Sequence, residues 1–422
     1  MRSTIRLISF LSFLFVTIVV SGQYSTRPYK DNVKALQVTR SDWNLSYPII
    51  YLDSPQDAVK ISFDLLSSEM HQITYSIVHC DAEWGLSDLS INEYLDGFQN
   101  SYIDNYDYSQ ATNIDYVNYS VNIPNADVQL KVSGNYAVVF YDEDDRDTLL
   151  TACFSVVEPI VDILGNVSGI SGSGSSKSQQ QLNFTVNHSN YSIRNPLTES
   201  KVVVMQNNDA RRRVLTSTPT YIHPDQLIFD HNPSLTFPGG DEFHIFEASS
   251  LRFAGEGVKS VDFFSPYYHV TLRPNQLREL VAYEYDDDIN GKFLIRRQES
   301  DDEDANLEAD YIVAHFTLPM ALPILDGKVY IGGDFTYNVA DATTQMVYNN
   351  ERKAYEASIM LKQGYYNYRY YVVSNRDGKV KSAPIELDAF QTENDYQVFF
   401  FHRAMGERYD RLVGYKLINS LR

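Results

Sequence analysis

The sequence predicts an all-β fold, a multi-domain chain of immunoglobulin-like and early-set β-sandwiches. Three observations carry this prediction. The 422 residues include 32 tyrosines and 22 phenylalanines, and aromatic residues favour pleated, half-buried surfaces. Short runs rich in β-branched and aromatic residues follow one another, with turn residues between them. Helical periodicity is almost absent, and Ile385 to Phe390 is the one short helix candidate.

The first domain is expected at residues 23–158. Turn residues such as Asp53-Ser54-Pro55 separate its apolar runs, and Glu158-Pro159 ends the domain. The acidic, tyrosine-dotted stretch from Trp84 to Tyr108 predicts a long loop, or a short helix with a loop. The remaining runs give about seven strands, the count of an immunoglobulin-like sandwich. The expected strands are 33–39, 47–52, 59–65, 72–79, 116–121, 136–141 and 149–157.

The second domain is expected at residues 159–308 and is less regular. Ser168 to Gln181 is rich in Gly, Ser and Gln, a composition that predicts a flexible loop early in the domain. Glu299 to Glu308 carries a run of acidic residues, which predicts a solvated linker at the end of the domain. The strand candidates are 182–186, 201–206, 227–229, 242–247, 258–264, 267–272, 279–285 and 291–297.

The third domain is expected at residues 309–422, with strands at 311–317, 328–331, 354–361, 366–373 and 396–401. The Gly-Asp-Phe turn at 333–335 and the aromatic strand at 364–370 resemble the early-set sandwich of glycogen- and starch-binding modules. Those modules stack sugars on tryptophan side chains. Tyr337 stands nearest that place here, and no Trp follows Trp84. This resemblance implies an alternative function, a carbohydrate-binding envelope protein that uses the C-terminal sandwich.

Residues 1–22 predict a signal peptide. Arg2 and Arg6 supply the positive start, Leu7 to Val20 is nearly continuous apolar sequence, and small residues precede Gln23. The apolar run is shorter than the roughly 20 residues that a membrane-spanning helix needs. An uncleaved N-terminal anchor is the alternative. No other segment approaches membrane length, so no membrane span is expected in the mature chain.

The charge balance excludes some classes of partner. Removing residues 1–22 takes away two of the 35 basic residues and leaves 33 beside 55 acidic ones. Nucleic acids and anionic membrane surfaces both attract an excess of Lys and Arg. We therefore expect no nucleic-acid partner and no binding to anionic lipid surfaces.

Cys80 and Cys153 are the two cysteines of the chain. In an exported protein an even number of cysteines permits a disulfide. If their strands are neighbours, a bond between them would close a long loop and stabilise the domain by about 4 kcal/mol. Two buried free thiols fit the sequence equally well, because the sequence does not place the two Cβ atoms.

No motif in the sequence indicates catalysis, a metal or a cofactor. The closest approach to a nucleophile elbow is Gly169 to Ser173, where Ser173 replaces the closing glycine and no helix follows. The nine histidines lack zinc-ligand spacing, and the acidic runs lack the frame of a calcium loop. The triplet Arg211-Arg212-Arg213 predicts local salt bridges or a hairpin edge. We expect a non-enzyme; an envelope hydrolase with a site formed between domains is the alternative.

The C-terminal block is the most informative segment. Gln397 to His402 is an apolar strand, Gly406 breaks the pattern, and a dense charged cluster follows at 407–411. An aromatic strand with an arginine-rich terminus either closes a sheet edge or docks on a partner. Because exposed Arg and Tyr are enriched at energetically important interface positions, we take Arg408, Tyr409 and Arg411 as candidate partner-binding residues. The alternative is that they complete the sheet of the third domain.

This block resembles the C-terminal signature of the plug protein family of the Bacteroidetes type IX secretion system. The resemblance extends to His79-Cys-Asp-Ala-Glu-Trp84, Glu93 to Phe98, Ser133-Gly-Asn-Tyr136 and the Gly-Asp-Phe and Gly-Tyr-Tyr-Asn-Tyr segments. It implies a periplasmic, non-enzymatic protein at the inner face of the outer membrane. The implied partner is the large translocon barrel of that membrane, and the implied function is to seal the periplasmic side of the barrel.

Overall fold

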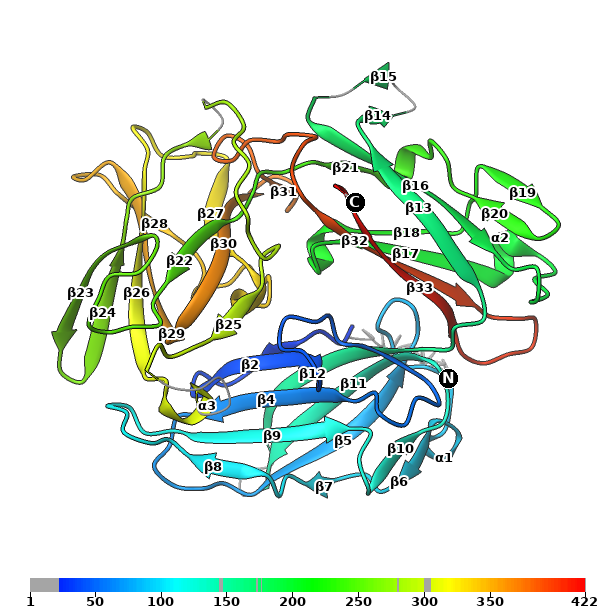
Figure 1. Cartoon of the computed structure of the whole chain (residues 1–422), viewed down its shortest axis with the longest axis horizontal. Coiled ribbons are helices and arrows are strands. Elements are labelled where there is room, and N and C mark those ends of the chain that lie inside the picture. Colours follow the sequence, from blue (N-terminus) through cyan, green and yellow to red (C-terminus); the bar gives the residue numbers. More distant parts are fainter. Residues whose placement is uncertain are drawn as a thin grey trace, which may run out of the picture.

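The structure is a computed structural model that describes residues 23–421 except 144–146, 172–173, 176, 279–280 and 300–304. The predicted signal peptide and the acidic run at 301–304 therefore lie outside the described residues. The described chain is built almost entirely of strands, which confirms the all-β prediction. Figure 1 shows three β-sandwiches arranged around a common centre. No helix among the described residues is long and apolar enough to cross a membrane.

The first sandwich forms from residues 23–158 and contains the largest core. Its strands bury alternate aromatic and aliphatic side chains between two sheets, among them Phe63, Tyr119, Tyr136, Phe140 and Phe154. One sheet has the order β1 (Arg27–Pro28), β12 (Thr148–Val157), β11 (Gly134–Asp142), β5 (Ile73–Cys80), β7 (Ser101–Tyr102), with β3 (Ile49–Tyr51) beside β12. The other has the order β2 (Val33–Arg40), β4 (Val59–Leu65), β9 (Val117–Ile123), β8 (Tyr106–Tyr108). The stretch expected as a long loop, or as a short helix with a loop, contains the short helix α1 (Ile91–Tyr94). It also carries three short strands that were not expected: β7, β8 and β6 (Leu95–Gly97), which pairs with β10 (Val128–Leu130).

The second sandwich combines residues from the middle and the end of the chain. One sheet has the order β13 (Asp162–Ser168), β16 (Gln179–Asn187), β20 (Gln226–Ile228), β19 (Tyr221–His223), with β21 (Thr236–Pro238) beside β16. The other has the order β18 (Arg213–Thr216), β17 (Ser200–Gln206), β32 (Asp395–His402), β33 (Arg411–Asn419). The short elements are β14 (Ile170–Ser171), β15 (Gly174–Ser175), α2 (Pro196–Glu199), η1 (Ala210–Arg212) and η2 (Pro233–Leu235).

The third sandwich starts well before residue 309. One sheet is β22 (His244–Glu247), β30 (Gly364–Ser374) and β25 (Phe293–Ile295), with β27 (Gly327–Gly332) and β31 (Val380–Lys381) also on β30. The other has the order β23 (Val258–Phe264), β24 (Tyr267–Leu272), β26 (Tyr311–Pro319), β29 (Ala354–Lys362), β28 (Val347–Asn349). The remaining elements are α3 (Ala305–Glu308) and η4 (Asp334–Thr336). The expected helix at 385–390 is a turn with irregular chain, and residues 281–285 form no strand.

The strand pairing departs from the expected boundary at 308/309. The strand expected at 396–401 forms, but it pairs with β17 of the second sandwich, so that Val203 lies opposite Phe399. Conversely, β22 pairs with β30 and β24 pairs with β26. The C-terminal strands bury Tyr396, Val398 and Phe400 in the second core. The shared core decides which strands form one sandwich. The acidic run at 299–308, which was expected to separate two domains, lies between β25 and β26 of the same sandwich.

Candidate functional sites: the C-terminal corner and the central cavity

The loop between β32 and β33, residues 403–410, rests on the first sandwich; we call this contact the C-terminal corner. Its anchor is Asp410, which is 1% exposed. The Asp410 carboxylate accepts hydrogen bonds from Ala82 N at 3.0 Å, Lys201 Nζ at 3.0 Å and Arg403 Nε at 2.8 Å. Burial raises the pKa of this carboxyl, but the Ala82 N–H and the Lys201 ammonium outweigh burial and lower the pKa below its usual value. Asp410 is therefore a buried carboxylate that fastens the loop.

Three separate sequence motifs meet at this corner. His79 Nε2 lies 3.2 Å from Ser133 O, and Asn135 Nδ2 donates to Asp81 O at 2.9 Å. Gly134 has φ +138°, and a Cβ there would lie 2.5 Å from His79 Nε2 and 3.3 Å from Asp410 O. Only glycine fits such a backbone without strain. The His-Cys-Asp-Ala, Ser-Gly-Asn-Tyr and terminal motifs thus form one joint, which sequence spacing alone did not reveal.

Burial lowers the pKa of His79 to about 4, although the Ser133 carbonyl opposes this shift. The ring packs edge-on against Tyr136 and Tyr409, with centroid distances of 4.9 and 5.5 Å. Its Nδ1 is buried without a hydrogen-bond partner. A second proton on the ring would have no acceptor, so the imidazole is neutral in the fold.

The structure brings the three candidate partner-binding residues together, and all three face the first sandwich. Arg408 pairs with Glu93 and donates to Asp88 O at 3.3 Å. Tyr409 packs against His79, and Arg411 donates to both carboxylate oxygens of Glu158 at 2.8 Å. Arg411 begins β33 and so does complete a sheet, but that sheet belongs to the second sandwich and not to the expected third domain. Arg408 and Tyr409 lie in the loop before it.

Large apolar side chains are exposed around Arg408. Met405 in the same loop is 94% exposed, and Leu86 and Ile91, on either side of Asp88, are 60% and 45% exposed. The Arg408 contacts to Asp88 and Glu93 bring the loop against this segment. An exposed apolar patch with an arginine inside it is typical of an interaction site.

The two cysteines are free thiols in the structure, and both are buried. Cys80 lies on β5 and Cys153 on β12, and β11 runs between these strands with Ala137 packed against both. Two strand spacings separate the backbones by roughly 10 Å, whereas a disulfide needs Cα atoms within about 7 Å. Burial raises the pKa of the Cys80 thiol to about 12 and also raises that of Cys153. Both groups are unreactive as thiolates in this fold.

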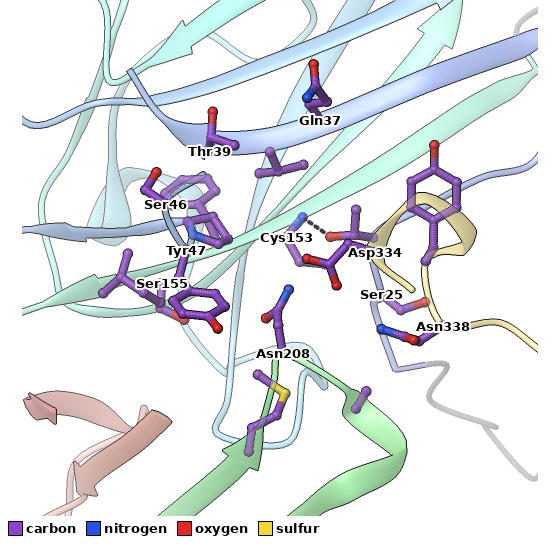
Figure 2. Close-up of a pocket in the computed structure, with 18 of the residues that line it drawn as sticks. Ser25, Gln37, Thr39, Ser46, Tyr47, Cys153, Ser155, Asn208, Asp334 and Asn338 are labelled. Atoms are coloured by element: carbon purple, nitrogen blue, oxygen red, sulfur yellow. Dashed lines mark hydrogen bonds between the residues drawn. The ribbon is translucent and has the colours of Figure 1, made fainter. Parts of the chain in front are cut away.

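A cavity of about 220 Å³ lies where the three sandwiches meet. Figure 2 shows polar side chains around it, including Gln37 and Thr39 from β2, Asn208 after β17, and Asp334 from η4. Burial raises the pKa of the Asp334 carboxyl to about 7, although the Lys292 ammonium and a hydrogen bond from Asn208 act in the opposite direction. The cavity therefore holds a carboxyl group that titrates near neutral pH.

Tyr337, the expected sugar-stacking residue, lines this cavity and is not on the outer surface. Its hydroxyl accepts a hydrogen bond from Leu36 N at 3.1 Å, and its ring packs against the core of the first sandwich. The Gly-Asp-Phe turn thus closes the contact between the third and first sandwiches. It does not present the stacking surface that motivated the carbohydrate-binding alternative.

The arginine triplet joins all three sandwiches. Arg211 pairs with Asp209 at 2.8 Å, donates to Asn338 at 3.0 Å and stacks over the Tyr371 ring at 3.8 Å. The next two side chains point in different directions. Arg212 donates to Ser382 Oγ at 2.9 Å in the third sandwich, and Arg213 donates to Ala82 O at 2.6 Å in the first. The predicted local salt bridge is present, but the contacts between sandwiches were visible only in the structure.

Within the part of the chain that the structure describes, no group of three or more His, Cys, Asp or Glu side chains converges as a metal site. His244 and Glu386 form a buried titratable pair, with Nε2 3.1 Å from Oε1. Asn275 Nδ2 lies 3.0 Å from His244 Nδ1 and receives the Tyr368 and Tyr370 hydroxyls on its oxygen. These groups bond to one another inside the third sandwich, although Glu386 Oε2 is buried without a hydrogen-bond partner.

Comparison with known proteins places the chain in a family. Residues 33–158 match the family model described as the type 9 secretion system plug protein first domain. A crystal structure of a hypothetical protein from Parabacteroides merdae ATCC 43184 matches with a TM-score of 0.92 and 39% identity. It covers 94% of this chain and 100% of that one. No curated protein matches the chain.

A second solved structure is far more distant. The C-terminal domain of the AgI/II polypeptide BspA of Streptococcus agalactiae matches with a TM-score of 0.16 and 7% identity, covering 91% of this chain and 98% of that one. So low a score carries no information about fold or function. The matched first domain and the chain-long relative together show that this chain belongs to the type IX secretion system plug protein family.

Proposed function

We propose that this protein is a non-enzymatic plug that seals the periplasmic side of the type IX secretion translocon barrel in the outer membrane. The family places the chain in type IX secretion. The observation that supports a stopper is the fastening of the sandwiches to one another. Asp410 joins the second to the first, Asp64 and Lys362 join the first to the third, and Asp209 and Arg369 join the second to the third.

The proposed mechanism is steric. A pore wide enough for folded cargo would leak periplasmic contents whenever it is empty, so a stopper has to fill it without changing shape. Buried charge pairs across these contacts fix how the sandwiches sit on one another, because each charge is compensated only in this one arrangement. Three sandwiches joined in this way behave as one body. The plug leaves when a complex of cargo and its carrier occupies the barrel from inside.

We place the contact with the barrel at the C-terminal corner. Arg408 is the most exposed of the three candidate residues, with 54% of its side chain accessible. Exposed apolar side chains lie near it in the loop, at Met405, and near its partners Asp88 and Glu93 in the chain, at Leu86 and Ile91. Tyr409 and Arg411 act indirectly by holding the loop in position. Arginine with neighbouring apolar anchors is the composition found at energetically important interface positions.

The test is affinity purification of the tagged full-length protein from native outer-membrane extract, with mass spectrometry of what co-purifies. The expected result is recovery of a very large barrel protein without a cargo carrier. A matched sample carries Met405→Asp and Arg408→Ala together and should lose the barrel while its unfolding curve stays unchanged. Recovery of glycan-processing proteins instead, or of nothing, would remove the support for a plug.

A cellular measurement separates plugging from mere association. A strain that lacks this chain but keeps the barrel should leak a folded periplasmic reporter enzyme into the medium, and complementation should stop the leak. Complementation by the Met405→Asp, Arg408→Ala protein should fail. A strain that lacks the chain without leaking would point to a role in secretion other than sealing.

A further inference from the structure

Two histidines, His269 and His315, form a pair on the outer face of the third sandwich and do not line the central cavity. His269 lies on β24 and His315 on the neighbouring parallel strand β26. Their neighbours Val270 and Ala314 point into the core. Because side chains alternate along a strand, both imidazoles stand on the opposite, partly exposed face.

The geometry of the pair is specific. His269 Nδ1 lies 2.8 Å from His315 Nε2, and the two ring planes are within 7° of parallel, with centroids 5.1 Å apart. Two nitrogens at this separation share one proton, since one ring must donate and the other accept. One proton therefore lies between His269 Nδ1 and His315 Nε2, and without it the lone pairs of both nitrogens would face the same space.

A hydrogen bond on the far side of one ring fixes its orientation. His315 Nδ1 lies 2.8 Å from Ser358 Oγ on the next strand, β29. A donor at Nδ1 leaves the Nε2 lone pair aimed at His269. Histidines that bind metals commonly hold their other nitrogen in this way, because the bond sets both the tautomer and the ring orientation.

We propose that His269 and His315 form a chelating site for one divalent transition-metal ion of the zinc, nickel or copper class. The ion takes the place of the shared proton, and that proton moves through solvent to the other ring nitrogen of His269, Nε2, so that both imidazoles stay neutral. Metal–imidazole bonds of about 2.0–2.1 Å place two ligand nitrogens roughly 3 Å apart when the bonds are at right angles. The observed 2.8 Å is close to that separation. Each ring has to turn so that its lone pair points to the ion, which lies off the line between the two nitrogens.

The ligand type sets the selectivity of the site. Imidazole nitrogen suits zinc, copper and nickel, whereas magnesium and calcium require oxygen ligands. No third His, Cys, Asp or Glu among the described residues joins the pair. The ion's other coordination positions are therefore open to water, or to a histidine or carboxylate of another molecule.

The test is calorimetric titration of the full-length, metal-free protein with zinc chloride, nickel chloride and copper chloride in turn. The expected result is one ion per chain, with affinity at least tenfold lower in each of His269→Ala and His315→Ala. Ser358→Ala should weaken binding several-fold, because it removes the bond that orients His315 and leaves both ligands. His223→Ala, at a fully exposed histidine on β19, is the matched control and should bind as wild type.

Unfolding curves should show that every variant keeps its fold, because both histidines lie on the outer face of the sheet. With copper, electron paramagnetic resonance should show splitting from two nitrogens in the wild type and not in either histidine variant. Absence of binding would overturn the proposal. Binding that survives His269→Ala, or that falls equally in His223→Ala, would also overturn it, because the ion would then be held by dispersed histidines.

Discussion

Lys362 Nζ lies 2.6 Å from Asp64 Oδ2, and both side chains are almost fully buried where β29 of the third sandwich meets β4 of the first. The Tyr311 hydroxyl donates to the same carboxylate oxygen at 2.6 Å, and the ammonium group lies 4.1 Å from the centre of the Tyr116 ring. An ion pair between two sandwiches couples their stabilities. Replacing either residue alone would leave the other charge buried at this contact without its counter-charge.

Lys362→Met should therefore destabilise the whole protein. It removes the cation and leaves the Asp64 carboxylate buried without its counter-charge, which costs about 3–5 kcal/mol. Adding Asp64→Leu should recover much of that loss, because the unpaired charge disappears. Chemical denaturation of the two single variants and the double variant gives the coupling energy directly.

Arg352→Ala is the matched control for this cycle. Arg352 pairs with Glu356 on the same β29 hairpin, but 73% of its side chain is exposed. Exposed ion pairs contribute about 1 kcal/mol or less. Equal losses from Lys362→Met and Arg352→Ala would mean that the buried pair does not couple the sandwiches.

Asp410→Ala should release the C-terminal corner. The substitution leaves the buried Ala82 N–H without its acceptor, and an unsatisfied buried group of this kind costs about 1–3 kcal/mol. It also removes the ion pair with the partly exposed Lys201. The loop 403–410 should then become a site of proteolytic cleavage. Mass spectrometry of limited digests checks this, with Glu407→Ala, a substitution at an exposed residue of the same loop, as the control. A digestion pattern identical to wild type would contradict the anchoring role.

The pKa of His79 gives the protein a defined sensitivity to acid. The folded pKa of about 4 lies below the ordinary value of 6.5, so between pH 6.5 and 4 the unfolded chain binds a proton that the folded chain does not. Stability is full above pH 6.5 and falls as the pH drops through this window, by up to roughly 3 kcal/mol. His79→Gln should flatten this part of the stability curve in urea unfolding at a series of pH values. An unchanged slope would show that another group titrates.

Local sequence patterns predicted most strands but not their partners. Tyr396 to Phe401 forms a strand as expected, yet it pairs with β17, almost 200 residues earlier in the chain. Alternation of apolar residues identifies a strand and its buried face, whereas the neighbour in the sheet depends on long-range packing. Tyr337 shows the same limit. Its place after the Gly-Asp-Phe turn was visible in the sequence, but the first sandwich covers the turn and makes the tyrosine a packing residue.

Asp334 should oppose stability at neutral pH, with the sign opposite to that of His79. Its folded pKa of about 7 lies above the ordinary carboxyl value of 3.8, so the folded chain keeps a proton that the unfolded chain loses between pH 4 and 7. The stabilising contribution is full below pH 4 and disappears as the pH rises through 7. Asp334→Asn should match wild type near pH 4 and exceed it by roughly 4 kcal/mol at pH 8. Thermal unfolding at the two pH values measures this difference, and equal gains at both would contradict a titrating carboxyl.

Charge reversal separates two ways in which Arg408 acts. It pairs with Glu93 inside the chain, and we propose that it also contacts the translocon barrel. Arg408→Glu places two acidic groups together and should lower both the unfolding temperature and the recovery of the barrel in affinity purification. Adding Glu93→Arg restores an internal pair with reversed polarity. The double variant should regain its unfolding temperature but not the barrel, because an arginine at 93 does not reproduce a cation at 408. Recovery of the barrel by the double variant would instead mean that Arg408 serves only to hold the C-terminal corner on the first sandwich.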